Sequence, residues 1–458
     1  MGRFKAGDIV EATGGKLVSE GNSREVKKFS IDSRSIKEGD VFIAVKGLNF
    51  DGHDFIKEAL SKGASGVISE RSPSPDLDVD GTHFIVVPDS IKAMADVAAR
   101  IRRSFTLPVV CVTGTNGKTT VKDMIASVLS SRYNVLKSKA SYNNIFGVCL
   151  TLFEMERSHT AAVLEIGTNS PGEIAYLAKI AAPDTVVITN IGRGHLEAFR
   201  DRRGIFEEKK SILKALPAGS LAVLNGDDDM LAGLRSEEYR VSFYGSGDNC
   251  DISLSKVKRV SSGTEFFVDK EKFFFPGEGR HNAYNAAVAI SVAKSMNVGI
   301  GDIRDKMAKT DLPSMRLEKS TFGGITFLND AYNANPSSFE AAVETLAATE
   351  PGKEKWVVAG DMLELGDASR ELHRDLGKKI ASLNLDFLIT IGKMAGQILA
   401  GARNYGMSED RTYAALSHRD AAEKIAERAS PETTVLVKGS RLMKMEEVIK
   451  CFITCSTR

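Results

Sequence analysis

The sequence predicts an α/β protein with three domains, and three observations support this. First, its 458 residues correspond to about three domains of roughly 150 residues each. Second, uniformly apolar segments such as residues 108–113 alternate with amphipathic segments, as expected for parallel strands that helices cover on both faces. Third, 42% hydrophobic and 26% charged residues are ordinary values for a globular protein, which argues against a disordered or fibrous chain.

The first domain is expected at residues 1–106, as a small mixed α/β unit. Short apolar strand candidates, among them residues 41–47 and 83–89, alternate with helical stretches and with a loop rich in Pro, Asp and Gly. The segment IKAMADVAARIRRSF is amphipathic, and Ser90 is its expected N-cap. Its end, just before Pro108, marks the first boundary.

The second domain is expected at residues 107–312 and should contain a parallel sheet. Four apolar strand candidates, PVVCVTG, TAAVLEIG, TVVITNIG and SLAVLNG, alternate with helical stretches. Residues 240–275 alternate differently and should form an antiparallel extension. A helix over residues 282–296 should close this domain.

The third domain is expected at residues 313–458. Its strand candidates GITFLNDAY, KWVVAGD, DFLITIG and TTVLVKG are separated by helical stretches. This alternation again indicates a doubly wound, Rossmann-like α/β fold.

Charge and composition narrow the function classes. Lys and Arg together number 61 and Asp and Glu number 60, which argues against a protein that binds nucleic acid through bulk charge. The N-terminal residues lack the apolar core of a signal peptide, and no apolar run of about 18 residues occurs, so we expect a cytoplasmic protein without membrane insertion. Five cysteines without a CxxC pair argue against a disulfide framework and a zinc site.

A phosphate-binding loop is predicted between the strand PVVCVTG and the helical segment that follows it. Glycines allow backbone N–H groups to point at phosphates, the helix N-terminus adds a partial positive charge, and the lysine adds a full one. The threonine after the lysine places a hydroxyl where Mg²⁺ would sit. The common spacing GxxxxGK[ST] would require glycine at position 112, where this chain has Val112, so the loop is a shorter type. A glycine-rich turn without a ligand is the alternative. The expected ATP-binding loop consists of Gly114, Thr115, Asn116, Gly117, Lys118, Thr119 and Thr120.

The loop and ten further motifs resemble the ATP-dependent Mur ligase superfamily. In chain order, between residues 30 and 441, the motifs are SIDSRSIKEGDVFIAVKG, DGHDF, SYNN, LEIGTN, HLE, GRHNAYNA, MRLE, NDAYNANP, VAGDMLELG and LVKGSR. Among Mur ligases, NDAYNANP with VAGDMLELG is most similar to those that add D-alanyl-D-alanine.

The resemblance implies formation of an amide bond. ATP would phosphorylate the terminal carboxylate of UDP-N-acetylmuramoyl-tripeptide, and the amine of D-alanyl-D-alanine would attack the acyl phosphate, as a step of peptidoglycan precursor synthesis. It also implies ATP and two Mg²⁺ ions as cofactors and a monomer in the bacterial cytoplasm. The alternatives are another Mur-type or folylpolyglutamate-type ligase and a nucleotide-dependent switch that hydrolyses ATP without ligation.

Four residues are expected to hold metal: Thr119, Glu165, His195 and Lys209. Glu165 ends an apolar strand beside the loop, where a hard oxygen ligand is expected, although a surface glutamate is the alternative. His195 and Lys209 follow from the resemblance, which implies that Lys209 becomes an N-carboxylated, anionic carbamate. A structural histidine and a solvated EEKK helix face, including Lys210, are the alternatives. A neutral lysine amine is required for this reaction, and burial favours it.

The resemblance also assigns residues around the nucleotide. Asn282 would contact the adenine side, with a helix N-cap as the alternative. Arg316 and Asp330 would act across the ATP phosphates, which requires the third domain to close onto the loop. Catalytic roles are thereby implied for Lys118, Lys209, His195 and Asp330.

Residues for the other two substrates also follow from the motifs. Tyr332, Asn333 and Asn335 are expected on the D-alanyl-D-alanine side, with helix capping as a competing role. The uridine nucleotide and the muramoyl peptide are assigned by motif position, and turn formation is the competing role for the residues near the uridine. The residues so assigned are Ser33, Arg34, Asp51 and His53 for the uridine nucleotide, and Asn143 and Asn144 for the muramoyl peptide.

Overall fold

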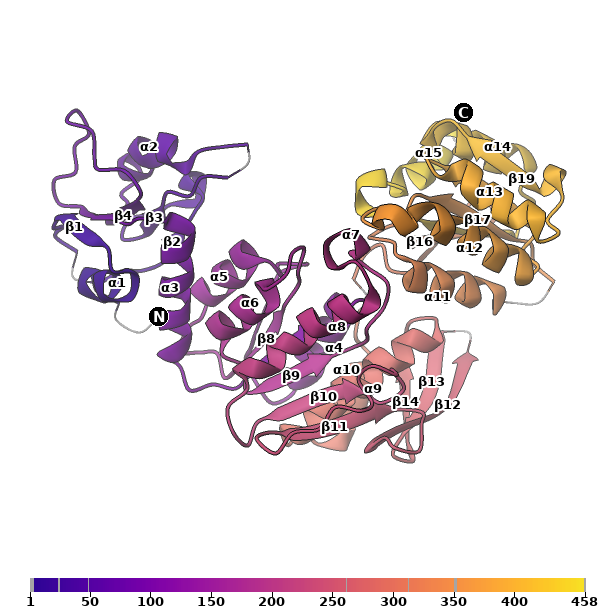
Figure 1. Cartoon of the computed structure of the whole chain (residues 1–458), viewed down its shortest axis with the longest axis horizontal. Coiled ribbons are helices and arrows are strands. Elements are labelled where there is room, and N and C mark those ends of the chain that lie inside the picture. Colours follow the sequence, from indigo (N-terminus) through magenta and orange to yellow (C-terminus); the bar gives the residue numbers. More distant parts are fainter. Residues whose placement is uncertain are drawn as a thin grey trace.

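The computed structural model describes residues 4–23, 25–47, 49–260, 262–311, 313–349 and 352–456. Within these ranges the chain forms three separate β-sheets, each flanked by helices (Figure 1). We refer to residues 4–106, 107–311 and 313–456 as the first, middle and third units. The first and third units lie at opposite ends of the molecule, with the middle unit between them. The predicted α/β class with three sheet-containing parts is confirmed.

The sheet of the first unit has the strand order β1-β5-β4-β3-β2, in which only β1 runs antiparallel to its neighbour. The helix predicted to begin after an N-cap at Ser90 is α3, but its N-cap is Asp89, whose carboxylate accepts a hydrogen bond from the Lys92 amide. Ser90 instead donates to Glu70 through both its amide and its hydroxyl, so the expected cap was wrong by one residue. The elements are α1 (Ala6–Thr13), β1 (Lys16–Ser19), β2 (Phe29–Ser30), η1 (Ser33–Ser35), β3 (Val41–Ile43), η2 (Gly52–Phe55), α2 (Ile56–Ser61), β4 (Gly66–Ser69), β5 (His83–Val86) and α3 (Ser90–Arg103).

The sheet of the middle unit has the order β14-β13-β12-β11-β10-β9-β6-β8-β7. Every residue of β6, β8 and β9 is buried, which explains their uniformly apolar sequences. The elements are β6 (Val109–Thr113), α4 (Lys118–Leu129), β7 (Val135–Lys137), α5 (Ile145–Phe153), β8 (Ala161–Glu165), α6 (Glu173–Ala181), β9 (Thr185–Ile188), α7 (Leu196–Phe199), α8 (Arg202–Lys210), η3 (Ser211–Ala215), β10 (Leu221–Asn225), β11 (Arg240–Gly245), β12 (Ile252–Val260), β13 (Gly263–Val268), β14 (Glu271–Phe275), α9 (Arg280–Ser295) and α10 (Ile300–Met307).

The antiparallel extension expected at residues 240–275 is confirmed only in part. Strand β13 pairs antiparallel with both β12 and β14. Strand β11 was wrongly included, because it pairs in parallel with β10. The connection over residues 226–239 is long enough for the crossover of about a dozen residues that parallel neighbours need.

The sheet of the third unit has the order β15-β16-β20-β17-β18-β19, parallel except for the hairpin of β15 and β16. The four predicted strands are β16, β17, β18 and β20, whereas β15 and β19 were missed. Both missed strands lie at sheet edges, and the polar sequence EKSTF of β15 lacks the apolar signal of a buried strand. The elements are β15 (Glu318–Phe322), β16 (Ile325–Asp330), α11 (Pro336–Ala347), β17 (Lys355–Gly360), η4 (Gly366–Ala368), α12 (Ser369–Ser382), β18 (Phe387–Ile391), α13 (Ala395–Asn404), η5 (Glu409–Arg411), β19 (Thr412–Ala415), α14 (His418–Arg428), β20 (Thr434–Lys438), η6 (Arg441–Met443) and α15 (Glu446–Ser456).

The arrangement of the middle and third units determines where a ligand can bind. Ligands of open parallel sheets bind beyond the carboxyl ends of the strands, and the loop after β6 lies at such an end. The third unit packs on the middle unit near α7, with α11 above the region of α9 (Figure 1). Across the described residues, no helix combines the length and the apolar character needed to cross a bilayer.

Candidate active site

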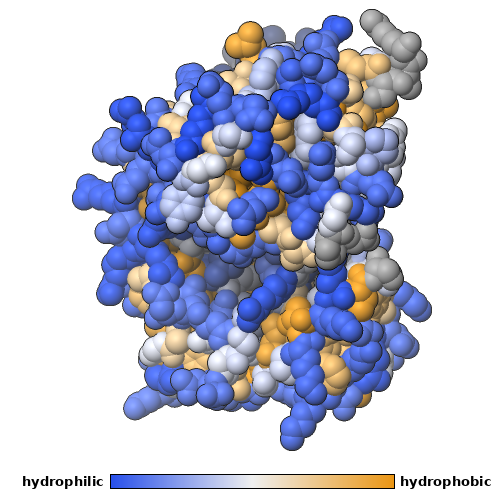
Figure 2. Space-filling model, turned by 90° about the vertical axis from the view of Figure 1, so that its right-hand side faces the viewer, coloured by the Kyte–Doolittle hydropathy of each residue, from blue (hydrophilic) through white to orange (hydrophobic). Residues whose placement is uncertain are grey.

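A cavity of about 1020 Å³ lies between the middle and third units and is lined by the phosphate loop, by Glu165 and His195, and by Arg316 and Asp330. None of the described residues 4–103 lines it. On the face where the two units meet, most side chains are hydrophilic, and a recess separates the upper from the lower half of the view (Figure 2). The structure thus brings residues of the two units together and leaves the first unit outside the cavity.

The phosphate loop requires glycine at two positions. Gly114 has φ of 144°, and a Cβ atom there would lie 1.9 Å from Thr189 Oγ1. Gly117 has φ of 83°, and its Cβ would lie 2.6 Å from Asn285 Oδ1. Left-handed backbone of this kind disfavours other residues. The loop between β6 and α4 is therefore tightly enclosed by Thr189, just after β9, and by Asn285 of α9.

Two side chains just after β9, the neighbour of β6 in the sheet, fix the centre of the loop. The Asn116 carbonyl accepts hydrogen bonds from Thr189 Oγ1 at 2.6 Å and from Asn190 Nδ2 at 3.1 Å. The Asn116 amide donates to Asn190 Oδ1 at 3.0 Å. Thr189 and Asn190 were missed from the sequence. They follow β9, whose pairing with β6 supplies the missing information.

Lys118 lies at the start of α4 and folds back over the loop. Its Nζ donates to the carbonyls of Gly114 at 3.0 Å and Thr115 at 3.2 Å. Desolvation lowers the pKa of Lys118, and Arg316 lowers it further, while Glu165 raises it. A cation beside a helix N-terminus without a side-chain cap is an anion-binding arrangement.

Glu165 has one carboxylate oxygen that is not used by the protein's own described donors. It is buried at the end of β8, and its Oε1 accepts a hydrogen bond from Asn143 Nδ2 at 2.7 Å. Its Oε2 is buried without a hydrogen-bond partner among the described residues. Thr119, whose Oγ1 accepts from Arg316 Nη2 at 3.0 Å, lines the same cavity. Within the described part of the chain no three His, Cys, Asp or Glu side chains cluster as a complete metal site. The donor set nevertheless fits Mg²⁺, which is commonly held by one or two carboxylates together with substrate phosphates.

A second lysine of α4 supports this wall of the cavity and was also missed. Lys122 is buried one turn after Lys118, and its Nζ donates at 2.8 Å to the carbonyls of both Ser138 and Ala140. These bonds hold the loop that carries Asn143. The i, i+4 spacing of the two lysines is a signal that the sequence did contain.

Lys209 is buried on α8, and desolvation followed by the charge of Lys118 lowers its pKa well below the ordinary lysine value. The EEKK segment divides between two environments. Glu207 and Lys210 pair with each other at 3.1 Å in partly exposed positions. Glu208 and Lys209 are buried, and Glu208 accepts from the amides of Gly172 and Ile174 at the start of α6. Lys209 is thus not part of a solvated face, although it is not among the described residues that line the cavity.

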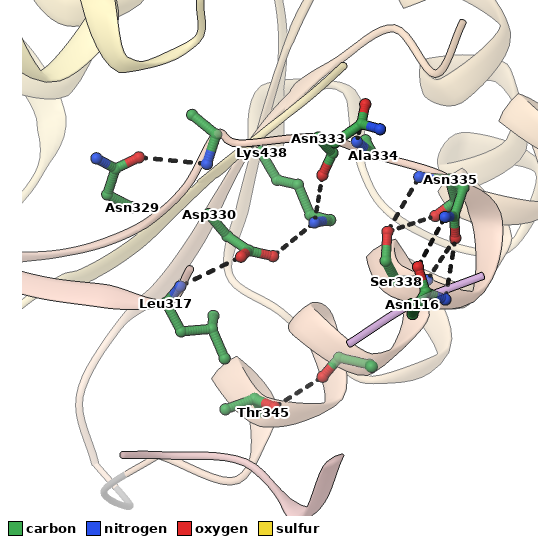
Figure 3. Close-up of polar contacts among 12 residues, drawn as sticks. Asn116, Leu317, Asn329, Asp330, Asn333, Ala334, Asn335, Ser338, Thr345 and Lys438 are labelled. Atoms are coloured by element: carbon green, nitrogen blue, oxygen red, sulfur yellow. Dashed lines mark hydrogen bonds and ion pairs between the residues drawn. The ribbon is translucent and has the colours of Figure 1, made fainter. Parts of the chain in front are cut away.

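The third unit touches the phosphate loop directly. Asn335 Nδ2 donates to Asn116 Oδ1 at 2.8 Å (Figure 3). The Arg316 guanidinium lies 4.2 Å from the centre of the Tyr332 ring, and the Tyr332 hydroxyl donates to Ser141. Arg316 Nε is buried without a partner among the described residues. The closure that the sequence-based assignment required is therefore present in this structure, with an unsatisfied cationic donor at the contact.

Asp330 and Lys438 form a pair at the carboxyl ends of β16 and β20, where they lie opposite each other in register. Lys438 Nζ is 2.5 Å from Asp330 Oδ2 and 2.9 Å from the Asn333 carbonyl (Figure 3). Lys438 is buried and was missed, although it belongs to the motif LVKGSR. Asn335 caps α11 together with Ser338, so its capping role exists alongside its contact with Asn116.

His195 has a left-handed backbone with φ of 57° and precedes α7. Its Nδ1 lies 2.6 Å from Oε2 of Glu364 in the third unit. The hydrogen bond from His195 lowers the pKa of the Glu364 carboxyl. Glu364 was missed, although it lies within the motif VAGDMLELG.

Asn282 is the third residue of α9, so it is not the N-cap, which is Gly279. Its side chain is buried. Its Nδ2 donates to the Glu278 carbonyl at 2.7 Å, and its Oδ1 accepts from Asn285 at 3.2 Å. His281 lines the cavity nearby, and burial lowers its pKa.

The residues assigned to the uridine nucleotide lie in the first unit and make local contacts. Ser33 Oγ donates to Glu58 at 2.7 Å, and Arg34 makes two contacts of 2.9 Å with Asp32. Asp51 caps η2, and hydrogen bonds from His53 lower its pKa to about 2. These contacts match the turn-forming alternative, while the guanidinium of Arg34 remains largely exposed.

The two asparagines assigned to the muramoyl peptide differ. Asn143 lines the cavity and donates a hydrogen bond to Glu165. Asn144 is exposed and caps α5, where its Oδ1 accepts from the Gly147 amide at 3.0 Å.

Family models and relatives cover almost the whole chain. Residues 25–102 match "Mur ligase family, catalytic domain", residues 112–293 match "Mur ligase middle domain", and residues 315–441 match "Mur ligase, glutamate ligase domain". The chain is 35% identical to the UDP-N-acetylmuramoyl-tripeptide–D-alanyl-D-alanine ligase of Bacillus subtilis and 32% identical to that of Escherichia coli, with 92% of each chain covered in both comparisons.

Solved structures are similar over the same extent. A crystal structure of MurF from Acinetobacter baumannii superposes with a TM-score of 0.90 at 30% identity, covering 99% of both chains. MurF ligase from Thermotoga maritima, in complex with ADP, superposes with a TM-score of 0.82 at 31% identity, covering 94% of this chain and 97% of the other.

Proposed function

Because the chain belongs to the Mur ligase family, we propose that it ligates D-alanyl-D-alanine to the peptide carboxylate of UDP-N-acetylmuramoyl-tripeptide in peptidoglycan synthesis. It is an ATP-dependent ligase that forms a carbon–nitrogen bond. The observation that carries the proposal is the contact of Arg316 and Asn335 with the phosphate loop. Through this contact the phosphate loop and the third unit line one cavity, to which the third unit contributes cationic and amide side chains.

The first chemical step requires two anions to approach. We propose that Lys118 and the backbone amides of the loop hold the ATP phosphates, while Arg316 neutralises charge next to Thr119. An oxygen of the tripeptide carboxylate attacks the γ-phosphorus, and ADP leaves. Mg²⁺ held by Thr119, Glu165, His195 and a carboxylated Lys209 would supply charge neutralisation for this transfer. Two observations support that role: Glu165 Oε2 has no hydrogen-bond partner among the described residues, and burial lowers the pKa of the Lys209 amine.

The second step forms the amide. The amine of D-alanyl-D-alanine attacks the acyl carbon, loses a proton, and inorganic phosphate leaves. We propose that Tyr332, Asn333 and Asn335 lie on the side of the cavity that holds D-alanyl-D-alanine. Asp330, which is paired with Lys438, has its catalytic role on the side of the third unit that faces the ATP phosphates. Closure of the cavity between two units would exclude water, which would otherwise hydrolyse the acyl phosphate.

Each of the three units then has one task. We propose a UDP-substrate domain at residues 1–106, a central ATP-binding domain at 107–312 and a D-alanyl-D-alanine domain at 313–458. In the first, Ser33, Arg34, Asp51 and His53 would hold the uridine nucleotide, since the exposed guanidinium of Arg34 suits a diphosphate.

One assay tests the function. Phosphate release from ATP is measured with UDP-N-acetylmuramoyl-tripeptide, with and without D-alanyl-D-alanine. We expect release to depend on the dipeptide and to match the amount of pentapeptide product. Dependence on glutamate or on a single amino acid instead would indicate another ligase of the family, and release without any acceptor would indicate a switch that hydrolyses ATP.

A further inference from the structure

The short turn that carries His195 is held from the third unit as well as from its own. His195 and Arg200, on either side of α7, both have positive φ, of 57° and 66°. Glu364, which faces this turn, has φ of 62°. Non-glycine residues adopt such conformations at a cost and persist in them only where surrounding contacts enforce them.

Side-chain and backbone contacts both join the turn to the loop after β17. Glu364 Oε2 lies 2.6 Å from His195 Nδ1, and the Glu364 carbonyl accepts from the Glu197 amide at 3.2 Å. Leu196 packs against the apolar core of the middle unit and also against that of the third unit. In Figure 1, α7 projects from the middle unit to the base of the third unit. The turn that carries His195 is therefore joined to the third unit by side-chain, backbone and apolar contacts.

We propose that Glu364 is a positioning residue that orients His195 across the junction of the two units, so that His195 offers Nε2 to the cavity only when the third unit is docked. This inference rests on the metal-binding role proposed above for His195. It adds that the site is completed from the third unit by a group that itself contacts no substrate.

The chemistry of the two side chains supports this assignment. An ionised carboxylate only accepts hydrogen bonds, so Nδ1 must carry the proton, and Nε2 of the neutral ring keeps its lone pair. Carboxylates in this position commonly fix the tautomer and orientation of metal-binding histidines. Since His195 lines the cavity, Nε2 is the nitrogen left for a cation there.

A second histidine of the chain provides an internal contrast. His53 makes the same contact with Asp51, Nδ1 to Oδ1 at 2.6 Å, but its Nε2 accepts a hydrogen bond from the Glu70 amide at 3.1 Å. Both nitrogens of His53 are thus used within the first unit. The pair of His195 and Glu364 differs in two respects, because it joins two units and because His195 lines the cavity, which His53 does not.

Docking of the third unit and binding of a cation at His195 are then reciprocal. A cation that binds at Nε2 stabilises the docked third unit, and the docked third unit raises affinity for that cation by the same factor. Loss of an outer partner of a metal-binding histidine typically weakens metal affinity roughly 10- to 100-fold.

The test uses the full chain with ¹⁵N-labelled histidine, of which there are seven. The variants are Glu364→Ala and Glu364→Gln, with Glu423→Gln as control, since Glu423 is an exposed carboxylate paired with Arg419 within α14. His195→Asn assigns the His195 signals by their absence. The readouts are the ¹⁵N shifts of the ring, the radius of gyration from X-ray scattering, and Mg²⁺ affinity in the presence of ADP.

In the wild type and the control we expect the proton on Nδ1 of His195. In Glu364→Ala we expect a mixture of tautomers, a larger radius of gyration and Mg²⁺ affinity reduced by roughly 10- to 100-fold. Glu364→Gln keeps an acceptor but loses its charge, so the Nδ1 proton should remain while the Nδ1 shift and the Mg²⁺ affinity change.

Unchanged ring shifts, radius and Mg²⁺ affinity in Glu364→Ala would overturn the proposal. If that variant does not fold, the same null result in Glu364→Gln overturns it. Failure of the proposed function would appear differently, as wild-type protein whose phosphate release is independent of D-alanyl-D-alanine.

Discussion

Replacing Gly117 with alanine should weaken nucleotide binding. Gly117 caps α4 with φ of 83° and ψ of −7°, in the left-handed region. An added Cβ would lie 2.6 Å from Asn285 Oδ1, a buried amide whose Nδ2 donates to Asn282 at 3.2 Å. The alanine variant must therefore either keep a strained backbone and displace Asn285, or rearrange the loop.

The two costs can be worked out separately. Left-handed backbone costs an alanine about 1–2 kcal/mol. Displacing Asn285 loses a hydrogen bond whose net contribution is about 0.5–1.5 kcal/mol. The total of about 1.5–3.5 kcal/mol corresponds to roughly 10- to 300-fold in affinity if the free protein relaxes and the nucleotide must restore the loop. If the loop does not relax, the same free energy lowers the unfolding stability.

Calorimetric titration with a non-hydrolysable ATP analogue, together with thermal unfolding, measures both quantities. The matched control is Gly7→Ala in α1, where an added Cβ meets nothing within 4 Å. It should raise stability slightly, by about 0.4–1 kcal/mol, without changing the affinity. A Gly117→Ala variant with both wild-type affinity and wild-type unfolding would refute this account of the loop.

Three further predictions concern charged groups. Asp330→Asn should lower the free energy of unfolding by about 3–5 kcal/mol in chemical denaturation, because it leaves Lys438 buried without its counter-charge. Adding Lys438→Met should restore part of that stability but not phosphate release. An Asp330→Asn variant that loses no stability would contradict the pairing. Lys209→Ala should abolish ligation, with partial rescue by acetate in the phosphate-release assay, whereas full activity without acetate would exclude the carbamate. In bicarbonate-free buffer Lys209 stays an amine, and its pKa is lower in the folded state than the 10.5 of an ordinary lysine. Between these two pKa values the unfolded state binds more protons than the folded state, so the free energy of unfolding rises with pH in that window. Lys209→Met should therefore be more stable than the wild type near pH 7, with an advantage that shrinks toward pH 10; denaturation at several pH values measures this, and a constant difference would contradict it.

The fold was predictable where burial is complete. Strands β6, β8 and β9 are buried along their whole length, and their apolar sequences show it. Strand β15 is half solvated at a sheet edge, so its sequence EKSTF carries no such signal. The direction of β11 depends on how its connection to β10 crosses the sheet, which the local pattern of either strand does not encode.

A candidate site can be predicted from sequence where its motif is continuous. The phosphate loop is one uninterrupted segment, so glycine, lysine and threonine reveal it together. Lys438 and Glu364 contact partners on other elements: Lys438 pairs with Asp330 across two strands, and Glu364 pairs with His195 across two units. Such pairs arise from sheet register and docking, and a single sequence shows neither before the fold is known.

The cavity includes no described residue of the first unit, and this separation affects how a donor would be selected. If the uridine end is held in the first unit, the donor itself must span the distance from that unit to the phosphate loop, so the length of its peptide decides whether its carboxylate reaches the loop. An extended peptide adds about 3.3–3.6 Å per residue. A donor one residue shorter would hold its carboxylate about one such step farther from the γ-phosphate than the roughly 3–3.5 Å at which two reacting atoms meet. The spacing of the two units would then select donors by peptide length, and no side chain would need to recognise the residue that a shorter donor lacks.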